Sequence, residues 1–283
     1  MLTYHCPLRW SDLDAQGHVN NEAVLDFMQE ARVELFHTGP TARLLGEGIV
    51  VVGHKVEYLA SIDYDDEPLQ TDIGVSRVGA ARFELCYELK QHGNPVARAR
   101  TTMCPFDFAT DRPVRLPLEI RSHLEQNLTA PKPMRDLIAL PLKERGTVTD
   151  IFVRWSDNDS FGHVNNVKAY DYIQQARVTA TSQWAPELAR AGAADARHNW
   201  LVARQDVTYL AQMSHRQEPF GARTAPINLG NTSMTLACEI FDPATGEIFT
   251  RGATVLVCAD EHMRPVRLPT DLRNACQQLL VTD

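Results

Sequence analysis

The stretch RWSDLDAQGHVNN, residues 9–21, occurs twice in this chain. Residues 154–166 read RWSDNDSFGHVNN, which is identical at ten of thirteen positions and lies 145 residues further on. A repeat spaced at about half the length of a 283-residue chain is typical of two duplicated domains. The two copies give fixed points from which the predicted elements of the two halves can be aligned.

The duplication extends over most of the chain. The hexapeptide RPVRLP recurs letter for letter at 112–117 and at 264–269. Between the halves, a stretch with three prolines and one glycine is typical of a linker. We therefore expect two domains and a linker, with bounds 1–128, 129–147 and 148–283.

Both halves follow one order of predicted elements, in which a strand precedes a long helix and a run of strands follows it. In the first helix the apolar positions Val24, Phe27, Met28, Ala31 and Leu35 step by three and four. That helix should begin at Asn20 or Asn21, which are good N-cap residues, and end at Gly39-Pro40. The predicted strands are 3–10, 49–59, 69–78, 82–91 and 95–106 in the first half, and 151–155, 200–210, 221–228, 234–241 and 248–258 in the second. Further predicted helices are 118–127, 166–183 and one after residue 269.

One long helix with five strands predicts a layered α+β unit. In such a unit a curved antiparallel sheet can wrap around the single long helix and bury its apolar side. We therefore expect two such units in tandem.

The composition excludes several classes of protein. A formal charge of −8 argues against nucleic acid as the main partner, because phosphate binding depends on clustered Lys and Arg. No apolar run approaches the roughly 18 residues of a membrane span, and the first ten residues lack the apolar core of a signal peptide. We expect an ordinary globular protein of the cytoplasm.

The six cysteines form no CxxC pair and lie mostly in apolar or alternating segments. We expect free, buried thiols. A nucleophilic cysteine stays open as an alternative, although no position is singled out.

The repeated stretch has a structural interpretation. Gly17 and Gly162 would supply a tight turn, the asparagines would cap the helix, and the aspartates would lie near its positive end. Stability explains the glycine and one asparagine. It does not explain why the aspartate at 14 and 159, the histidine at 18 and 163, and both asparagines recur. The pairs 13/158, 15/160 and 16/161 have diverged in the same stretch.

A functional interpretation fits the recurring positions better. A helix N-terminus carries partial positive charge and unpaired N–H groups, so it can polarise a carbonyl and hold a developing oxyanion. Asp14 or Asp159 could then attack that carbonyl or activate water against it. Asp12 and Asp157 also recur and rank behind them, because they lie further from the helix start.

His18 and His163 could bind metal, but each stands beside asparagines without HxxxH or Cys/His spacing. We expect no metal and no cofactor. Each histidine should instead bond the turn backbone or the carboxylate of its site, with direct acid/base catalysis as the alternative.

A strand, then D-x-x-G-H-V-N-N, then a long helix resembles the hotdog-fold thioesterases of the 4-hydroxybenzoyl-CoA thioesterase type. The motif RWSDLDxxxHVNN is also similar to that of acyl-ACP thioesterases, which join two hotdog units in one chain. The resemblance covers both halves and implies a tandem, or double, hotdog acting in lipid metabolism. It would hydrolyse an acyl thioester to the free acid and a thiol.

The resemblance also implies roles for residues of the two copies. The catalytic aspartate matches Asp14 and Asp159, the polarising backbone N–H matches Asn21 and Asn166, and His18 and His163 match the histidine of the acyl-ACP branch. That branch has asparagine where Gln16 and Phe161 stand here. This departure favours acyl-CoA as the substrate over acyl-ACP.

Coenzyme A carries several negative charges, so an acidic protein needs basic residues at the site. The repeated arginines of RPVRLP are the preferred candidates, although this hexapeptide could only direct the chain into the last helix of each half. Relatives often have a small hydroxyl residue at the start of the fourth strand, which Ser233 matches and Arg82 does not. The candidate substrate-binding residues are Arg82, Arg112, Arg115, Ser233, Arg264 and Arg267.

Three alternatives to an acyl-CoA thioesterase stay open: an acyl-ACP thioesterase, a hotdog dehydratase or hydratase, and a non-catalytic acyl-CoA-binding module. The dehydratase motif has proline between Asp and His, and neither copy does. The intact Asp and His argue against a module without turnover. The length and type of the acyl chain are left open. It is also open whether chains of two fused units, each a pseudo-dimer, assemble into a homo-oligomer.

Overall fold

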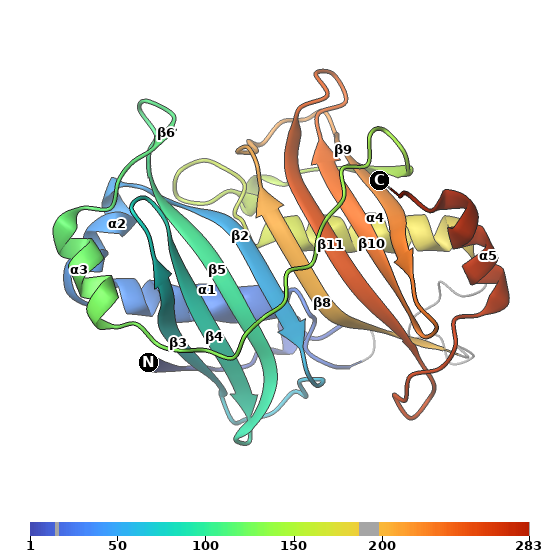
Figure 1. Cartoon of the computed structure of the whole chain (residues 1–283), viewed down its shortest axis with the longest axis horizontal. Helices are drawn as coiled ribbons and strands as arrows, with labels where there is room; N and C mark the ends of the chain where they lie inside the picture. Colours follow the sequence, from blue (N-terminus) through green and yellow to red (C-terminus); the bar gives the residue numbers. More distant parts are fainter. Residues whose placement is uncertain (15–16, 187–197, 283) are drawn as a thin grey trace. The chain divides into compact units, whose positions relative to one another are not determined.

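The computed structural model describes residues 1–14, 17–186 and 198–282. The chain divides into two compact units, Met1–Arg135 and Asp136–Asp283. Each unit consists mainly of antiparallel strands with a few helices (Figure 1). In the part of the chain that the structure describes, no helix is long and apolar enough to cross a membrane.

The strands of unit 1 form an antiparallel sheet in the order β1-β3-β4-β5-β2, and the short β6 pairs with β5. In β4, Phe83, Leu85, Tyr87 and Leu89 are buried at alternate positions, so these side chains share one face of the sheet. The strands are β1 (Leu2–Cys6), β2 (Ile49–Tyr58), β3 (Leu69–Val78), β4 (Phe83–Gln91), β5 (Asn94–Asp107) and β6 (Arg112–Pro113).

Helix α1 (Ala23–Phe36) lies against this face and packs on β1 and β3. The ring of Phe36 meets that of Phe83 edge-on, with 6.1 Å between centroids. Figure 1 shows α1 running behind the strands of its own sheet. Burying each large apolar side chain in such a layer contributes about 1.5–3 kcal/mol. The shorter helices of unit 1 are η1 (Trp10–Asp12), η2 (Gly39–Thr41), α2 (Ala42–Glu47) and α3 (Leu118–Gln126).

Unit 2 repeats this arrangement. Its strands follow the order β8-β11-β10-β9-β7, all antiparallel, and helix α4 (Lys168–Trp184) packs on β7, β9 and β10. Read from the other end, this order matches that of unit 1 strand by strand, so the duplication holds for the topology. The other elements are β7 (Thr147–Ile151), η3 (Trp155–Asp157), β8 (Asn199–Tyr209), β9 (Phe220–Leu229), β10 (Ser233–Phe241), β11 (Ile248–Ala259) and α5 (Thr270–Leu279).

The first predicted strand of each half is wrong. The strand predicted at 3–10 ends at Cys6, and the strand predicted at 151–155 shares only Ile151 with β7. In each unit a turn of 3-10 helix then begins, at Trp10 and at Trp155. The reason is a cap that the apolar pattern does not show. The carboxylate of Asp12 accepts the Arg9 N–H at 2.7 Å, which curls the backbone out of the strand.

Three further elements, η2, α2 and β6, were not predicted from the sequence. Gly39-Pro40 ends the long helix as expected, but η2 and α2 follow at once. Pro40 can occupy the first turn of a new helix because its missing N–H would have no partner there. The other element is β6, which is too short for a periodic pattern to reveal.

The segment between the halves is held against both units. In unit 1 the Thr129 N–H donates to the Val75 carbonyl at 2.8 Å, and Arg100 donates to the Lys132 carbonyl at 2.6 Å. In unit 2, Leu142 is fully buried and its N–H donates to Glu239 at 3.3 Å. The described residues 129–146 contain no helix or strand. The bounds of the linker and of the two domains stay a prediction.

All six cysteines are free and buried, as the sequence predicts. Burial raises the pKa of Cys6, Cys258 and Cys276 to about 11 and that of Cys238 to about 12. Burial also raises the pKa of Cys104. Since the thiolate is the reactive form, none of these five thiols is poised to act as a nucleophile near neutral pH.

We therefore predict that the native protein reacts slowly with Ellman's reagent at pH 8, with less than about one thiol labelled in the first minutes. After unfolding in guanidinium chloride all six thiols should react at once. Labelling is measured by absorbance of the released chromophore. Rapid labelling of a native thiol would show an accessible thiolate and contradict the assignment of the cysteines to the core.

Candidate functional site

Both copies of the repeated stretch fold into the same turn. The Asp14 N–H donates to the His18 carbonyl at 2.7 Å, and the Asp159 N–H donates to the His163 carbonyl at 2.7 Å. Gly17 and Gly162 close the two turns at φ of +82° and +81°. Glycine adopts this conformation more readily than any residue with a Cβ, so it suits both turns.

The aspartate of each copy fixes the turn with its side chain. An Asp14 oxygen accepts the His18 N–H at 3.2 Å. An Asp159 oxygen accepts the N–H groups of Phe161 at 2.9 Å and His163 at 3.2 Å. Both aspartates are half-buried, so their carboxylates are partly desolvated but still accessible. Gln16, whose identity bears on the choice of substrate carrier, lies outside the described residues.

The same turn also occurs where no motif is present. Asp260 bonds its own N–H to the Arg264 carbonyl at 2.9 Å, and its carboxylate accepts the N–H groups of His262 and Arg264 at 2.9 Å each. These bonds therefore explain why an aspartate suits the turn. They do not explain why both copies continue into His-Val-Asn-Asn at the start of a long helix.

Asn20 and Asn165 connect the turn to the helix. Their N–H groups donate to the carbonyls of Asp12 at 2.7 Å and Asp157 at 2.8 Å. The side-chain oxygen of Asn165 accepts the Val167 N–H at 3.3 Å, and the matching bond of Asn20 is long, 3.5 Å to the Glu22 nitrogen. These asparagines thus hold the residues just before the helix.

The helices consequently begin later than predicted, at Ala23 and Lys168 rather than at an asparagine. Asn21 and Asn166, the predicted backbone donors, lie two residues ahead of the first helical residue. They belong to the turn that leads into the helix, where N–H groups still point away from the helix body.

Two tyrosines that were not predicted as site residues from the sequence contact the turn before each helix. The Tyr58 hydroxyl donates to the Asn21 carbonyl at 3.0 Å, and the Tyr209 hydroxyl donates to the Asn166 carbonyl at 2.6 Å. They are the last residues of β2 and β8. The sequence held a signal, because Tyr-Leu recurs at 58–59 and 209–210, but a repeated dipeptide does not say what its hydroxyl contacts.

The histidines differ between the copies. His18 Nε2 lies 3.9 Å from an oxygen of Asp63, which is largely exposed, so this contact is weak. Val19 and Val164 make equivalent N–H bonds, to the carbonyls of Ile62 and Met213, both at 2.8 Å. The residue that matches Asp63 in unit 2 is therefore Ser214, which has no charge to offer His163.

Asp12 and Asp157 have mainly structural contacts, which supports ranking them behind Asp14 and Asp159. Asp157 is buried, and one of its oxygens accepts the Arg154 N–H at 2.8 Å and the Tyr172 hydroxyl at 2.7 Å. The pKa of Tyr172 is raised, first by burial and then by this hydrogen bond. Phe27 stands at the matching position of unit 1 and cannot make the bond.

The turn of unit 1 lies at one end of its sheet. Val19 bonds Ile62, and the side chain of Gln91 bonds both the N–H and the carbonyl of Asp63, at 3.1 and 2.7 Å. The motif is therefore next to the last residue of β4.

The candidate substrate-binding residues lie at the opposite end. The Leu116 N–H donates to the Ala80 carbonyl at 3.0 Å, which places RPVRLP beside Arg82 and the first residue of β4. Nine residues of β4 separate the two ends, a span of roughly 26 Å at about 3.3 Å per residue. In Figure 1, β6 marks this end, opposite the arrowheads of β2 and β4.

Unit 2 has the same separation, because the Leu268 N–H donates to the Asn231 carbonyl at 2.9 Å beside Ser233. Within each unit, the structure thus does not bring these candidates to the motif. The five arginines, Arg82, Arg112, Arg115, Arg264 and Arg267, are exposed, whereas Ser233 is half-buried.

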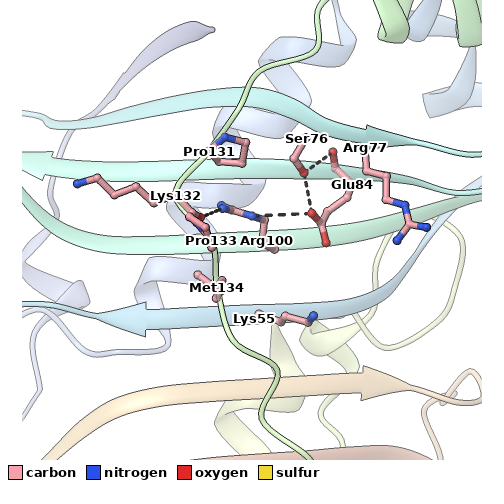
Figure 2. A pocket seen from close by; sticks show the side chains of 9 residues that line it. All are labelled: Lys55, Ser76, Arg77, Glu84, Arg100, Pro131, Lys132, Pro133 and Met134. Carbon is pink, nitrogen blue, oxygen red and sulfur yellow. Dashed lines mark hydrogen bonds and ion pairs between the residues drawn. The ribbon is translucent and has the colours of Figure 1, made fainter.

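A pocket of about 280 Å³ lies on unit 1, where residues 131–134 cross the sheet (Figure 2). Glu84 alternates with buried Phe83 and Leu85, so the pocket is on the face opposite α1. Arg100 lies 3.8 Å from Glu84, and Ser76 donates to Glu84 at 2.7 Å. No residue of the repeated turn lines this pocket, which is lined by Lys55, Ser76, Arg77, Glu84, Arg100, Pro131, Lys132, Pro133 and Met134.

Among the described residues, no group of three or more His, Cys, Asp or Glu side chains is arranged to hold a metal ion. The turns therefore present a carboxylate, a histidine and backbone N–H groups at the start of a helix. These groups suit attack on a carbonyl carbon.

One family model matches both repeats. A model of the thioesterase-like superfamily matches residues 8–124 and again 153–276. None of the curated proteins matches the sequence.

Similar solved structures support the fold. An acyl-ACP thioesterase from Bacteroides thetaiotaomicron has 14% identity and a TM-score of 0.67, with 90% of this chain and 96% of that chain covered. A 12:0-ACP thioesterase from Umbellularia californica has 14% identity and a TM-score of 0.69, with 91% and 97% covered. At this identity the likeness concerns the fold alone.

The positive φ of Gly162 gives a prediction. Gly162→Ala should lower the free energy of unfolding by about 1–2 kcal/mol, because alanine is strained at φ +81°. It should also lower activity several-fold by displacing Asp159. Urea unfolding and an activity assay measure the two effects.

Gly246→Ala is the matched control, since Gly246 has φ +77° and, like Gly162, open space around its Cα. It lies in the β10–β11 turn and should lose similar stability without loss of activity. Equal loss of activity in both variants would mean that the turn has no special part in function.

Proposed function

Because the chain belongs to the thioesterase-like superfamily and is a thioester hydrolase, we propose that it cleaves acyl-CoA through Asp14 and Asp159. The carrying observation is the duplicated turn, in which a half-buried carboxylate is fixed by backbone N–H groups just before a long helix. A tandem hotdog, with one long helix under each sheet, is the fold that this proposal assumes.

The start of the helix would stabilise the charge that develops on the substrate. When a nucleophile adds to the thioester carbonyl, the carbonyl oxygen becomes an oxyanion. The N–H of Asn21 or Asn166, aided by the partial positive charge of the helix terminus, would donate to it. One such donor is typically worth about 3 kcal/mol of the barrier.

The carboxylate would supply the other half of the reaction in one of two ways. As a base it takes a proton from water while the water oxygen bonds to the carbonyl carbon. As a nucleophile it bonds to that carbon itself, and water later hydrolyses the resulting anhydride. Both routes expel the CoA thiolate, which then takes up a proton.

His18 and His163 would position the carboxylate. Each provides the carbonyl that accepts the aspartate N–H and an N–H that the aspartate side chain accepts. This assigns them to the turn rather than to proton transfer, although their half-buried rings stay within the candidate site.

The carrier is proposed to be CoA, with acyl-ACP as the alternative. Arg82, Arg112, Arg115, Ser233, Arg264 and Arg267 are kept as candidates for binding it. Their distance along the sheet means that, within one unit, only a long carrier could reach from them to the turn. Truncating Arg112 and Arg115 to alanine should raise KM for acyl-CoA and leave kcat unchanged if they bind its phosphates.

We predict that Asp14→Asn and Asp159→Asn each remove one site. Asparagine keeps an oxygen that accepts the turn N–H groups, so the fold should persist while the base or nucleophile is lost. The double variant should lose at least a hundredfold in kcat. Thiol release is measured with acetyl-, medium-chain, long-chain and aromatic acyl-CoA and with acyl-ACP.

Asp260→Asn is the control, because Asp260 forms the same turn away from the motif, and this variant should keep wild-type activity. A single variant with full activity would show that its site is idle. A change in enoyl absorbance without thiol release would favour hydration. Tight binding without turnover across the whole panel would favour a binding module.

A further inference from the structure

Tyr58 and Tyr209 make the same hydrogen bond in the two units. Each ends the second strand of its unit and donates its hydroxyl to the carbonyl of the second asparagine of the motif, at 3.0 and 2.6 Å. The partners are 37 and 43 residues apart in sequence, so the bond is tertiary. A contact that recurs in two units with diverged surroundings calls for an explanation beyond local packing.

We propose that Tyr58 and Tyr209 are positioning residues that aim the backbone N–H of Asn21 and of Asn166 at the thioester oxygen. This inference rests on the proposed function. It assigns to the two tyrosines a role that neither the motif nor the family match gives them.

Hydrogen bonds hold the peptide units on both sides of Asn21. The peptide unit between Asn21 and Glu22 is held at its carbonyl by Tyr58 and approached at its N–H by the Asn20 side chain. The preceding unit, between Asn20 and Asn21, is held at its carbonyl by the Ala23 N–H at 3.0 Å. These hydrogen bonds therefore orient both peptide planes beside Asn21, and the Asn21 N–H takes part in none of them.

Unit 2 gives the same result with shorter bonds. Tyr209 holds the Asn166 carbonyl, the Asn165 side chain holds the Val167 N–H at 3.3 Å, and the Asn165 carbonyl accepts the Lys168 N–H at 2.9 Å.

The helix alone would not orient this group. Asn21 and Asn166 precede the first helical residues, and in unit 2 the Ala169 N–H reaches the Asn166 carbonyl only at a long 3.4 Å, so the helix holds these residues weakly. An oxyanion donor acts through its direction as well as its distance, and it gains most when its orientation is fixed before the reaction. A phenol at the end of a rigid strand is suited to fix it.

The test is to replace each tyrosine by phenylalanine, which keeps the ring and removes the hydroxyl. Tyr58→Phe is made in the Asp159→Asn background and Tyr209→Phe in the Asp14→Asn background, so that each assay reports one site. We expect kcat to fall by about five- to tenfold and KM to change by less than about twofold.

A pair of CoA analogues separates positioning from a general loss of structure. A trifluoromethyl ketone analogue, which forms a tetrahedral adduct, should bind about five- to tenfold more weakly, in step with kcat. An S-alkyl-CoA thioether, which has no carbonyl oxygen, should bind equally well. Tyr87→Phe is the matched control, since the buried Tyr87 hydroxyl makes no aligned hydrogen bond within the described residues.

Unchanged kcat in both tyrosine variants, with an active parent, would overturn the positioning role and leave the proposed function intact. Equal weakening of both analogues, with a lower unfolding temperature, would also overturn it, because the tyrosines would then support only the fold. If the wild-type chain released no thiol from any substrate, the proposed function would fail and this inference with it.

Discussion

Both candidate sites depend on one constraint, a five-residue turn closed by an aspartate carboxylate and a glycine of positive φ. The carboxylate accepts backbone N–H groups of its own turn, so it cannot rotate away from the helix start that follows. Hydrogen bonds to a charged group of this kind contribute about 1.5–3 kcal/mol each. One interaction thereby stabilises the turn and fixes the direction of a carboxylate nine residues ahead of the first helical residue. Asp260 shows that the turn also forms elsewhere, so the His-Val-Asn-Asn sequence that continues each copy into a long helix is what distinguishes the two sites.

The strands could be predicted because their burial alternates and glycine or proline punctuates them. β3 agrees with the prediction at both ends, and β4 differs by one residue at its start. Prediction was weakest where side chains bond the backbone, as at Trp10, where the Asp12 cap ends the extended chain. The helix starts were displaced for the same reason, because the Asn20 and Asn165 side chains accept the N–H groups of Glu22 and Val167 in the turn just before each helix. Local hydrogen bonds of this kind leave no periodic signal.

The residues around the site were harder to predict than the motif itself. Comparing the two copies identified the aspartates, because they stayed constant while their neighbours diverged. Tyr58 and Tyr209 contact the motif only after two elements have folded together, and no spacing rule connects residues 37 or 43 positions apart. Arg32 gives a second example, since it lies on the apolar side of α1 and is only 5% exposed. A helical pattern would place such a residue in solvent.

The duplication conserves the turn but not its surroundings. Asp157 is buried against the Tyr172 hydroxyl, whereas Phe27 holds the matching position in unit 1. His18 has Asp63 nearby, whereas unit 2 has Ser214 there. A neutral hydroxyl beside Asp157 and a carboxylate near His18 therefore change the polar surroundings of the turn in opposite units. The two repeats share one turn in two different environments.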